Sequence, residues 1–422
     1  MRYFLGIYDA AGYLYKLGKG LEENNNIVRY INIGNDRFKY SDTNEYGISR
    51  KLEGLLTSYP AGSFRRFTLY PLVILSRLYI LLNEIFKSDV FIFSGTQSFF
   101  DFYDLPILKL FGKTIIVMYF GSDARPTYLS GKHIDDHNTS FTPKRSYYES
   151  KKIKNRVHRV EKWSHYIVNH IGTSQFFTRK CVMFSYLGIP YDKSLLNLEK
   201  SNNEILTNRI RVLHAPSRPK AKGSAVFKRI ISELKTNNKE IDYIEITNKT
   251  NNEVIKEIQA CDIVLDELYS DMPLATLGVE ASILKKPIIV GGYFSRYISK
   301  STPKKAIPPV IFVEPKLIEG TIVDLINHRT NWKTIGQMQY LYVKENYSPS
   351  VVAKKIELLS IGKVPDEYWF SPIDEDYIHG WGLSEKQLKT QLREYIEELG
   401  VESLLLQHNL ALKDKLVEFC YT

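Results

Sequence analysis

A short basic loop follows one of the apolar strands predicted in the second half of the chain. The strand Arg211–Ala215 leads into PSRPKAKG, and a helix is predicted directly afterwards. Arg218, Lys220 and Lys222 would then lie at the carboxyl end of a strand, beside a helix N-terminus. Ligands of parallel sheets bind at that edge, and the free N–H groups and the dipole of a helix start favour anions. The pattern favours an anion site over ordinary solvated charge.

A second segment, DIVLDELYSDMPLATLGVEAS, combines a glycine with a carboxylate at the start of a predicted helix. The helix opens near Leu277 and Gly278, and Glu280 falls in its first turn. Glycine lets a backbone approach a ligand closely. A carboxylate in this position accepts hydrogen bonds from ribose hydroxyls in other nucleotide sites, although it would also stabilise a bare helix end. We expect a nucleotide site at Leu277–Glu280.

Neighbouring polar residues allow two interpretations. Asp266 and Glu267 would either bind sugar hydroxyls or only terminate the strand before that helix. His214 is expected to pack beneath the basic loop rather than to act in catalysis. The run His133-Ile-Asp-Asp-His137 gathers several metal-binding side chains, but it lacks the order of a helical zinc site, so we expect no metal there.

The elements that must position these residues alternate between strand and helix. In the second half the pattern predicts, in turn, Ile210–Ala215, Ala225–Leu234, Ile241–Ile246, Asn251–Ala260, Ile263–Leu268, Leu277–Leu284 and Pro287–Gly291. In the first half it predicts strands at Arg2–Tyr8, Ile27–Ile33, Val90–Ser94, Thr114–Phe120 and Tyr166–Val168, with helices at Leu14–Glu23, Phe64–Phe86 and Leu105–Phe111. This alternation indicates an α/β fold of doubly wound, Rossmann-like units with parallel sheets.

The chain is expected to form two such units and an extension. Its 422 residues exceed what a single core usually supports. We expect a first domain over 1–190, a polar linker at 191–208, a second domain over 209–347, and a helix crossing back plus a tail over 348–422. The tail carries an aromatic, acidic loop, YWFSPIDEDYIHGW, before a helix predicted at Ser384–Leu399.

The order of the motifs resembles a known family. HAPSRPKAKG, CDIVLDEL and GVEASILKKPIIV follow one another in the second half, and DVFIFSGTQSFF, LPILKLFGK and MYFGSDARP do so in the first. Over roughly residues 1–360 this order is similar to that of the retaining family-4-type glycosyltransferases of bacterial surface polysaccharide synthesis. The resemblance implies the GT-B fold, in which two Rossmann-like domains face a cleft. It also implies transfer of a sugar from a nucleotide-sugar with retention of configuration.

The resemblance gives roles to the matching residues of the second half. Lys222 would neutralise the donor diphosphate, with help from Arg218. The backbone at Leu277 and Gly278 would contact phosphate, and Glu280 would hold the ribose. A cation and a helix start at these places would stabilise the negative charge left when the sugar–phosphate bond breaks.

Two residues of the first half receive roles in the same way. Asp123, in GSDARP, would face the cleft near the sugar or acceptor, unless it only shapes a turn. Gly12 would let the chain approach the donor phosphates. The donor would be linked to UDP or GDP. Neither cleft-facing loop holds a convincing D-x-D pair, so no metal and no other cofactor is expected.

The sequence departs from the family pattern at two places. The family's first acidic residue, eight positions before Glu280, is Met272 here, with Asp271 beside it. The family's arginine, five positions before the lysine, is Ser217 here, with Arg218 adjacent. We therefore expect Asp271 and Arg218 to take over donor contacts. A catalytically silent scaffold of a polysaccharide assembly complex and a nucleotide-sugar epimerase of the same fold remain alternatives.

Composition limits the remaining possibilities. With 57 Lys and Arg against 47 Asp and Glu, the formal charge is +10, which points to an anionic partner. No basic-aromatic recognition motif supports nucleic acid. The three cysteines are far apart, which argues against a disulfide framework and fits a reducing compartment. The N-terminus does not read as a signal peptide, so we expect a cytoplasmic protein.

Two segments raise the question of a membrane. The apolar stretch Phe64–Phe86 would either cover the sheet as a core helix or lie in a membrane interface; apolar residues on most of its faces favour the core. The basic run Lys144–Lys162 would dock lipid phosphate or form a solvated face. From the basic charge we expect peripheral contact with the inner face of an anionic membrane. The acceptor would then be a glycan or a polyprenyl-phosphate-linked sugar.

Overall fold

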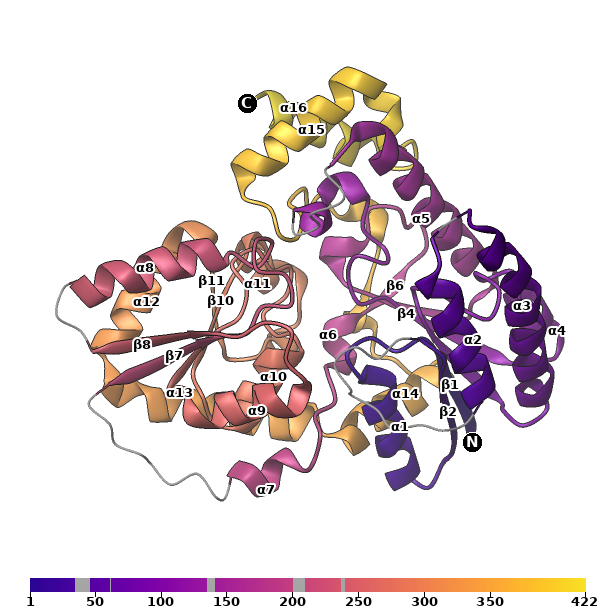
Figure 1. The fold of residues 1–422 in the computed structure, drawn as a ribbon, viewed down its shortest axis with the longest axis horizontal. Coiled ribbons are helices and arrows are strands. Elements are labelled where there is room, and N and C mark those ends of the chain that lie inside the picture. Colours follow the sequence, from indigo (N-terminus) through magenta and orange to yellow (C-terminus); the bar gives the residue numbers. More distant parts are fainter. Residues whose placement is uncertain (35–45, 61, 135–140, 200–208, 237–239) are drawn as a thin grey trace.

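The protein is built on two separate sheets. The computed structural model describes residues 1–34, 46–60, 62–134, 141–199, 209–236 and 240–422. Within them, the first half forms one sheet and the second half another, and the two lie side by side with the tail packed above the first (Figure 1). The expected pair of Rossmann-like units is therefore confirmed.

The first sheet has the strand order β12-β6-β5-β4-β3-β1-β2 in the described residues. Its strands are β1 (Arg2–Ile7), β2 (Ile27–Asn32), β3 (Val90–Ser94), β4 (Thr114–Met118), β5 (Tyr166–Asn169), β6 (Cys181–Met183) and β12 (Trp369–Phe370). All pairs are parallel except β12 with β6. Strands such as Val90–Ser94 are buried throughout, as continuous apolar runs covered on both faces must be.

The second sheet is parallel, with the order β11-β10-β9-β7-β8. Its strands are β7 (Ile210–His214), β8 (Ile241–Glu245), β9 (Ile263–Leu265), β10 (Ile288–Gly291) and β11 (Ile311–Val313). Because β7, β9 and β10 are neighbours, the loops that leave their carboxyl ends meet at one edge. That edge faces the first half.

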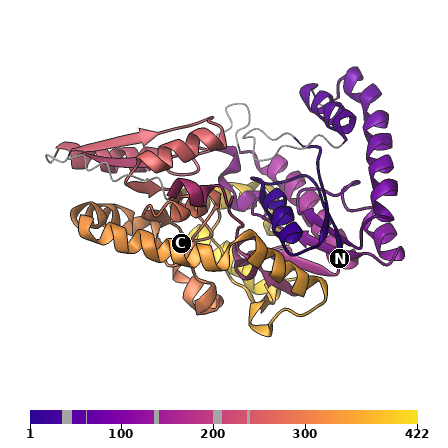
Figure 2. The same ribbon diagram turned by 90° about the horizontal axis from the view of Figure 1, so that it is seen from below.

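Helices flank both sheets (Figures 1 and 2). In the first half they are α1 (Tyr13–Glu23), α2 (Gly47–Ser58), α3 (Phe64–Ile85), α4 (Leu105–Leu110), α5 (Pro143–Trp163), α6 (Phe184–Leu187) and α7 (Leu195–Glu199). Then follow α8 (Ser224–Thr236), α9 (Asn251–Ala260), α10 (Thr276–Ile283), α11 (Ile298–Ser301), α12 (Ile318–Asn327), α13 (Trp332–Asn346), α14 (Pro349–Ser360), α15 (Glu385–Leu399) and α16 (Leu410–Tyr421).

Helix α14 packs against the first half. It packs against α1, where Asn24 donates from Nδ2 to the carbonyl of Ser350 at 3.0 Å. The two backbones touch at Gly20, where a Cβ would lie 1.9 Å from the carbonyl oxygen of Pro349. A glycine is therefore required for this crossing.

The tail belongs structurally to the first half. Strand β12 extends the first sheet, which the sequence did not predict. Helix α15 begins at a capping box formed by Ser384 and Gln387, close to its predicted start. It packs on α5, and the rings of Tyr128 and Tyr395 lie 4.9 Å apart between their centroids.

The expectation that Phe64–Phe86 is a core helix was wrong for much of its surface. Helix α3 buries only one stripe, which includes Val73 and Ile80. It runs along the outer edge of the first half (Figure 2), so its opposite face has no layer above it. Apolar residues on most faces of a helix cannot all be covered by contact on one side. Among the described residues, α3 is the one helix whose length and apolar composition would allow it to cross a membrane. Core helices of soluble proteins have the same length and composition.

The basic helix α5 uses several of its cations within the protein. Lys154 donates to the carbonyl of Leu405 at 2.5 Å, and Arg159 pairs with Asp101 at 2.5 Å. These contacts hold the tail and the loop after β3 against the helix. The run Lys144–Lys162 therefore has a structural role, and only part of it remains a solvated face.

Candidate functional site

A pocket lies between the two halves, at the edge where the strands of both sheets end. Its lining from the first half includes His170 and Phe184, and its lining from the second half includes Met272, Leu274 and Phe294. Met272 holds the position of the family's first acidic residue. The wall at that position is therefore apolar.

Lys222 is held by two carboxylates at this edge. Its Nζ lies 2.8 Å from Oε1 of Glu267 and 3.5 Å from Oδ1 of Asp266, and all three residues are buried. The contact follows from the sheet order, since Lys222 belongs to the loop after β7 and both acids follow the neighbouring β9. Gly223, with φ +80°, closes this loop against Leu268.

The three charges set one another's protonation. Burial works against the charge of Lys222, but Glu267 and Asp266 outweigh it and raise its pKa. Burial also opposes the charge of Glu267, yet Lys222 brings the pKa of that acid below its usual value. Asp266 is the acid whose charge is disfavoured: burial and the neighbouring charge of Glu267 raise its pKa to about 6, although Lys222 opposes the shift. A phosphate entering here would meet a permanent cation that is already paired.

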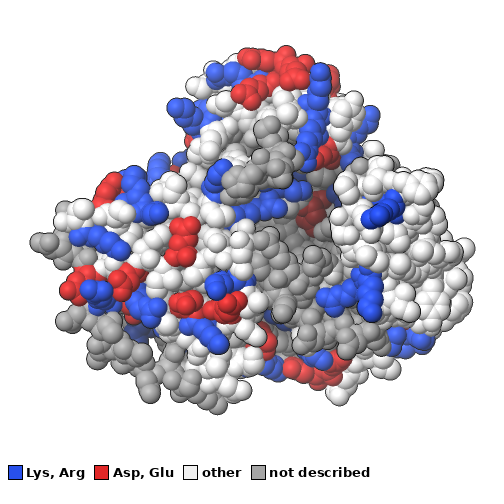
Figure 3. Space-filling view, viewed as in Figure 1, with Lys and Arg blue, Asp and Glu red and all other residues white. Residues whose placement is uncertain are grey.

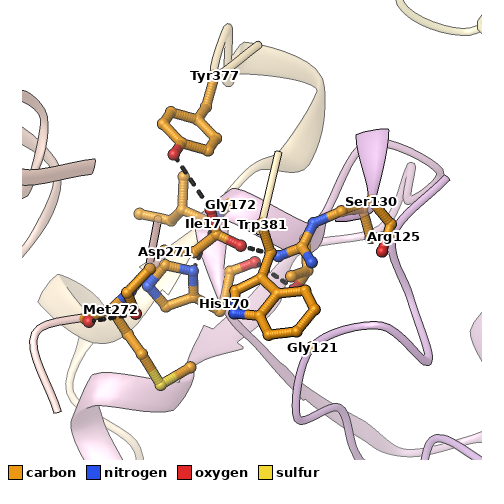
Figure 4. A network of polar contacts seen from close by, with 12 residues as sticks. Gly121, Arg125, Ser130, His170, Ile171, Gly172, Asp271, Met272, Tyr377 and Trp381 are labelled. Carbon is orange, nitrogen blue, oxygen red and sulfur yellow. Dashed lines mark hydrogen bonds and ion pairs between the residues drawn. The ribbon is translucent and has the colours of Figure 1, made fainter. Parts of the chain in front are cut away.

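A network next to Lys222 joins both halves and the tail (Figure 4). Arg125, after β4, forms a buried ion pair with Asp271, after β9, and the hydroxyl of Tyr377 in the tail donates to the same carboxylate at 3.1 Å. Burial lowers the pKa of Arg125 to about 10, although nearby Tyr377, Asp123 and Glu267 oppose the shift. Asp271 therefore ties three segments that are far apart in the sequence.

The tail also reaches the Lys222 cluster. Nε1 of Trp381 donates to Oε2 of Glu267 at 2.8 Å, and the amide of Gly131 donates to the carbonyl of Trp381 at 2.7 Å. Two residues earlier, the ring of His379 stacks on Tyr293 at 4.2 Å. The stretch 377–382 thus lies between the halves and bonds to each of them.

Glu280 lies at another place on the same edge of the second sheet. We call it the Glu280 corner, and the first corner, around Lys222, Asp266, Glu267 and Asp271, is the Lys222 corner. It is buried, and Nδ2 of Asn251 donates to its Oε1 at 2.8 Å. Burial raises its pKa, while Lys16 of α1 and Asn251 oppose the rise. The predicted glycine lies beside the first corner, since a Cβ at Gly278 would come within 3.6 Å of Oδ2 of Asp266. The start of α10 carries no side-chain cap, so no capping side chain binds its first amides.

The residues predicted in the first half act mainly on their own loops. Asp123 accepts from the amides of Phe120 and Gly121, at 3.2 and 2.9 Å, and so shapes the turn after β4. Burial raises its pKa. Gly12 has φ +69° at the start of α1, as a close turn requires. The following amides, at Leu14 and its neighbour, are bound by Asp9.

The remaining predicted residues are dispersed. Ser217 is exposed, and Arg218 donates across the cleft to the carbonyl of Lys132 at 2.8 Å. His214 is packed, as expected, between the carbonyl of Leu265 and Ser224, each at 2.8 Å. In the motif His133–His137, the last three residues lie outside the described residues.

Four residues of the site were missed from the sequence: Arg125, Asn251, Tyr377 and Trp381. The aromatic, acidic loop YWFSPIDEDYIHGW supplies two of them, Tyr377 and Trp381. No local pattern connects it with Glu267 or Asp271, which lie more than a hundred residues earlier.

Two Rossmann-like sheets facing a cleft, with a late helix returning to the first half, define the GT-B fold of glycosyltransferases. No protein-family model matches the sequence, and no curated protein matches it either. Among solved structures, Anabaena HepE in complex with UDP is similar, with a TM-score of 0.50, 13% identity, and coverage of 85% of this chain and 99% of that one. The catalytic domain of starch synthase IV from Arabidopsis thaliana, bound to ADP and acarbose, gives 0.50, 10%, 86% and 98%. At these identities the likeness establishes the fold.

Proposed function

We propose that the protein is a glycosyltransferase that moves a sugar from a nucleotide-sugar to a glycan or lipid-linked acceptor. The observation that supports this most is the edge of the second sheet. Within it lie a buried lysine, an uncapped helix start and the buried carboxylate of Glu280, the fifth residue of that helix. This is the arrangement a nucleoside diphosphate needs, on a fold whose solved examples include UDP- and ADP-bound proteins.

The donor would lie along this edge from one corner to the other. Glu280 would accept hydrogen bonds from the ribose in addition to the one that Asn251 donates to its Oε1. The amides at Leu277 and Gly278 would contact the diphosphate. Lys222 would face the bond that breaks, since Asp266 and Glu267 hold it charged and in place.

Transfer requires that the diphosphate accept the electron pair of the sugar–phosphate bond. Lys222 and the start of α10 would stabilise that charge, a contribution commonly worth about a hundredfold or more in rate. The acceptor hydroxyl would attack the anomeric carbon and lose its proton. In a transfer with retention it would approach from the face that the diphosphate leaves, and the released phosphate oxygen is a base within reach.

Sugar recognition is proposed to differ from the family pattern. Met272 gives the pocket an apolar wall, and Asp271 is already bound by Arg125 and Tyr377. Arg218 is likewise engaged with Lys132. We propose that Asp271 and Arg218 hold the two halves together, and that the donor sugar is recognised by Asp266, Glu267 and Asp123.

A silent scaffold is the second candidate, because one observation favours it. Stretch 377–382 fills part of the space between the halves and bonds to Glu267, next to the lysine that would meet the phosphate. In such a protein, substitution of Glu280 would leave the cellular glycan unchanged, whereas deletion of the tail would abolish it.

The test is a thermal-shift panel of UDP-, GDP- and ADP-linked sugars. We expect one nucleotide class to raise the unfolding midpoint of the wild-type protein. Lys222→Ala and Glu280→Gln should each abolish the shift, and Lys228→Ala, an exposed lysine on α8, should keep it. No shift with any nucleotide-sugar would contradict the proposal.

A further inference from the structure

The outer face of α3 is apolar and uncovered. Its large apolar side chains are between 39% and 79% exposed. They recur at helical spacing along the whole element: Phe64, Phe67, Leu75, Leu78 and Leu82, with Phe86 directly after the helix. A soluble surface rarely carries so long a continuous apolar stripe without a partner.

The opposite face fixes how α3 lies. Arg77 is buried and pairs with Glu53 of α2 at 2.5 Å, and Glu84 is buried and pairs with Arg29 of β2 at 2.8 Å. Crossing a bilayer would require these pairs to separate or to enter hydrocarbon, which is costly for each charge. The helix must therefore lie along a surface, with only its outer stripe exposed to a partner.

The apolar face continues beyond α3. Leu110 at the end of α4 is 85% exposed, and the ring of Phe111 meets that of Phe86 at 5.8 Å. We define the α3 face as Phe64–Phe86 together with Leu110 and Phe111. It presents an elongated ridge of leucines and aromatic rings.

In the described residues, most of the charges around the α3 face that reach solvent are cations. Those exposed are Arg65 on α3, Lys51 on α2, and Lys87 and Lys109 near its far end, and Lys113 is half-buried. The nearby acid Asp89 is partly exposed and is paired with Arg2 at 2.5 Å. The carboxylates of α2 and α3 in the described residues, Glu53 and Glu84, are the buried ones already paired. Figure 3 shows the corresponding lobe as white surface with blue patches.

We propose that the α3 face docks on the surface of an anionic lipid bilayer. Leucine and aromatic side chains would enter the acyl boundary while the surrounding cations meet lipid phosphates, as in interfacial amphipathic helices. A second copy of the chain would bring the same cations against themselves, which disfavours a symmetric protein contact. The inference extends the proposed function by naming the surface that meets a membrane-borne acceptor, but its test does not depend on sugar transfer.

The test is co-sedimentation of the full chain with vesicles. Phosphatidylcholine vesicles are compared with vesicles of equal parts phosphatidylcholine and phosphatidylglycerol, and binding is expected to the anionic ones. The triple variant Leu75→Ser, Leu78→Ser, Leu82→Ser should weaken that binding at least about tenfold. A matched triple on the second half, Leu317→Ser, Met338→Ser, Leu341→Ser, also changes exposed apolar residues and should bind like the wild type.

Three further arms separate the outcomes. Arg65→Gln, Lys87→Gln, Lys113→Gln should reduce binding to anionic vesicles by about fivefold per charge. Tryptophan fluorescence of Leu75→Trp should shift to the blue with anionic vesicles, and that of Leu341→Trp should not, which also covers the case of a poorly folded triple variant. The nucleotide-sugar thermal shift should survive the leucine triple variant. Absence of wild-type binding, unchanged binding of the leucine triple, or a dimer that this triple dissociates would each overturn the proposal.

Discussion

The two corners of the interdomain edge are built from similar residues and behave differently. At the Lys222 corner, Glu267 and Asp271 are bound by Lys222, Arg125, Tyr377 and Trp381, so these two carboxylates are paired inside the protein. At the Glu280 corner, a buried acid is bound through its side chain by Asn251, and its pKa is raised. The first corner is preorganised by the fold, and the second retains capacity for a ligand.

This difference explains how a site can be both rigid and receptive. Preorganised charge stabilises a transition state without rearrangement, and the Lys222 corner has that character. A buried carboxylate with spare acceptor capacity is costly until hydroxyl donors arrive, and Glu280 has that character. Breaking the first corner should therefore affect stability, whereas changing the second should affect ligand binding.

The largest effect is expected from Lys222→Met. It would leave Asp266 and Glu267 buried without their cation, which typically costs about 3–5 kcal/mol of folding free energy. Chemical denaturation should show this loss, and adding Glu267→Gln should restore part of it. An unchanged free energy of unfolding for the single variant would mean that the cluster is not held as described.

An acid-dependent loss of stability is expected next, and His379 of the tail is part of it. Burial lowers the pKa of His379 to about 4, so the folded protein resists a proton that the unfolded chain accepts below about pH 6.5. The stability that the buried neutral imidazole of His379 contributes is complete above pH 6.5 and is lost as the pH falls towards 4. His214, at about 4, and His170, at about 3, act in the same direction, and Asp266, at about 6, opposes them.

Denaturation of the wild type at pH 7 and pH 5 measures this loss. In His379→Phe, which keeps a ring against Tyr293, the loss between the two pH values should be smaller by about 2 kcal/mol. An identical pH dependence in both proteins would show that His379 is not buried against Tyr293.

The smallest effect is expected from Tyr377→Phe. It removes one hydrogen bond to Asp271 but leaves the Arg125 ion pair, so about 1 kcal/mol should be lost. Tyr297→Phe, on the ring that packs against Tyr377, is the matched control and should cost less. Equal losses would assign the effect to packing rather than to the bond with Asp271.

The sequence predicted the sheets because their strands are continuous apolar runs. Strand β3 (Val90–Ser94) and helix α9 (Asn251–Ala260) have the predicted bounds. Strand β9 (Ile263–Leu265) begins at the predicted residue and ends before the predicted Leu268. The same local pattern predicted the helix that carries Glu280, but the expectation that Glu280 lies in its first turn was wrong, because α10 begins at Thr276. Such features depend on neighbouring residues, so one chain is enough to predict them.

Contacts between loops could not be predicted in this way. The bond from Lys222 to Glu267 depends on β7 lying beside β9, and the bond from Trp381 depends on the path of the tail. The prediction for α3 failed for a related reason. Its sequence reports how apolar the helix is, but not which other elements are available to cover it.

The most direct test of the central claim is release of nucleoside diphosphate from the nucleotide-sugar that stabilises the protein. We predict release by the wild type, a loss of at least about tenfold in kcat/KM for Glu280→Gln, and no change for Glu245→Gln, an exposed acid at the end of β8. Equal rates for the wild type and Glu280→Gln would contradict the account, as would a bound donor that is never consumed.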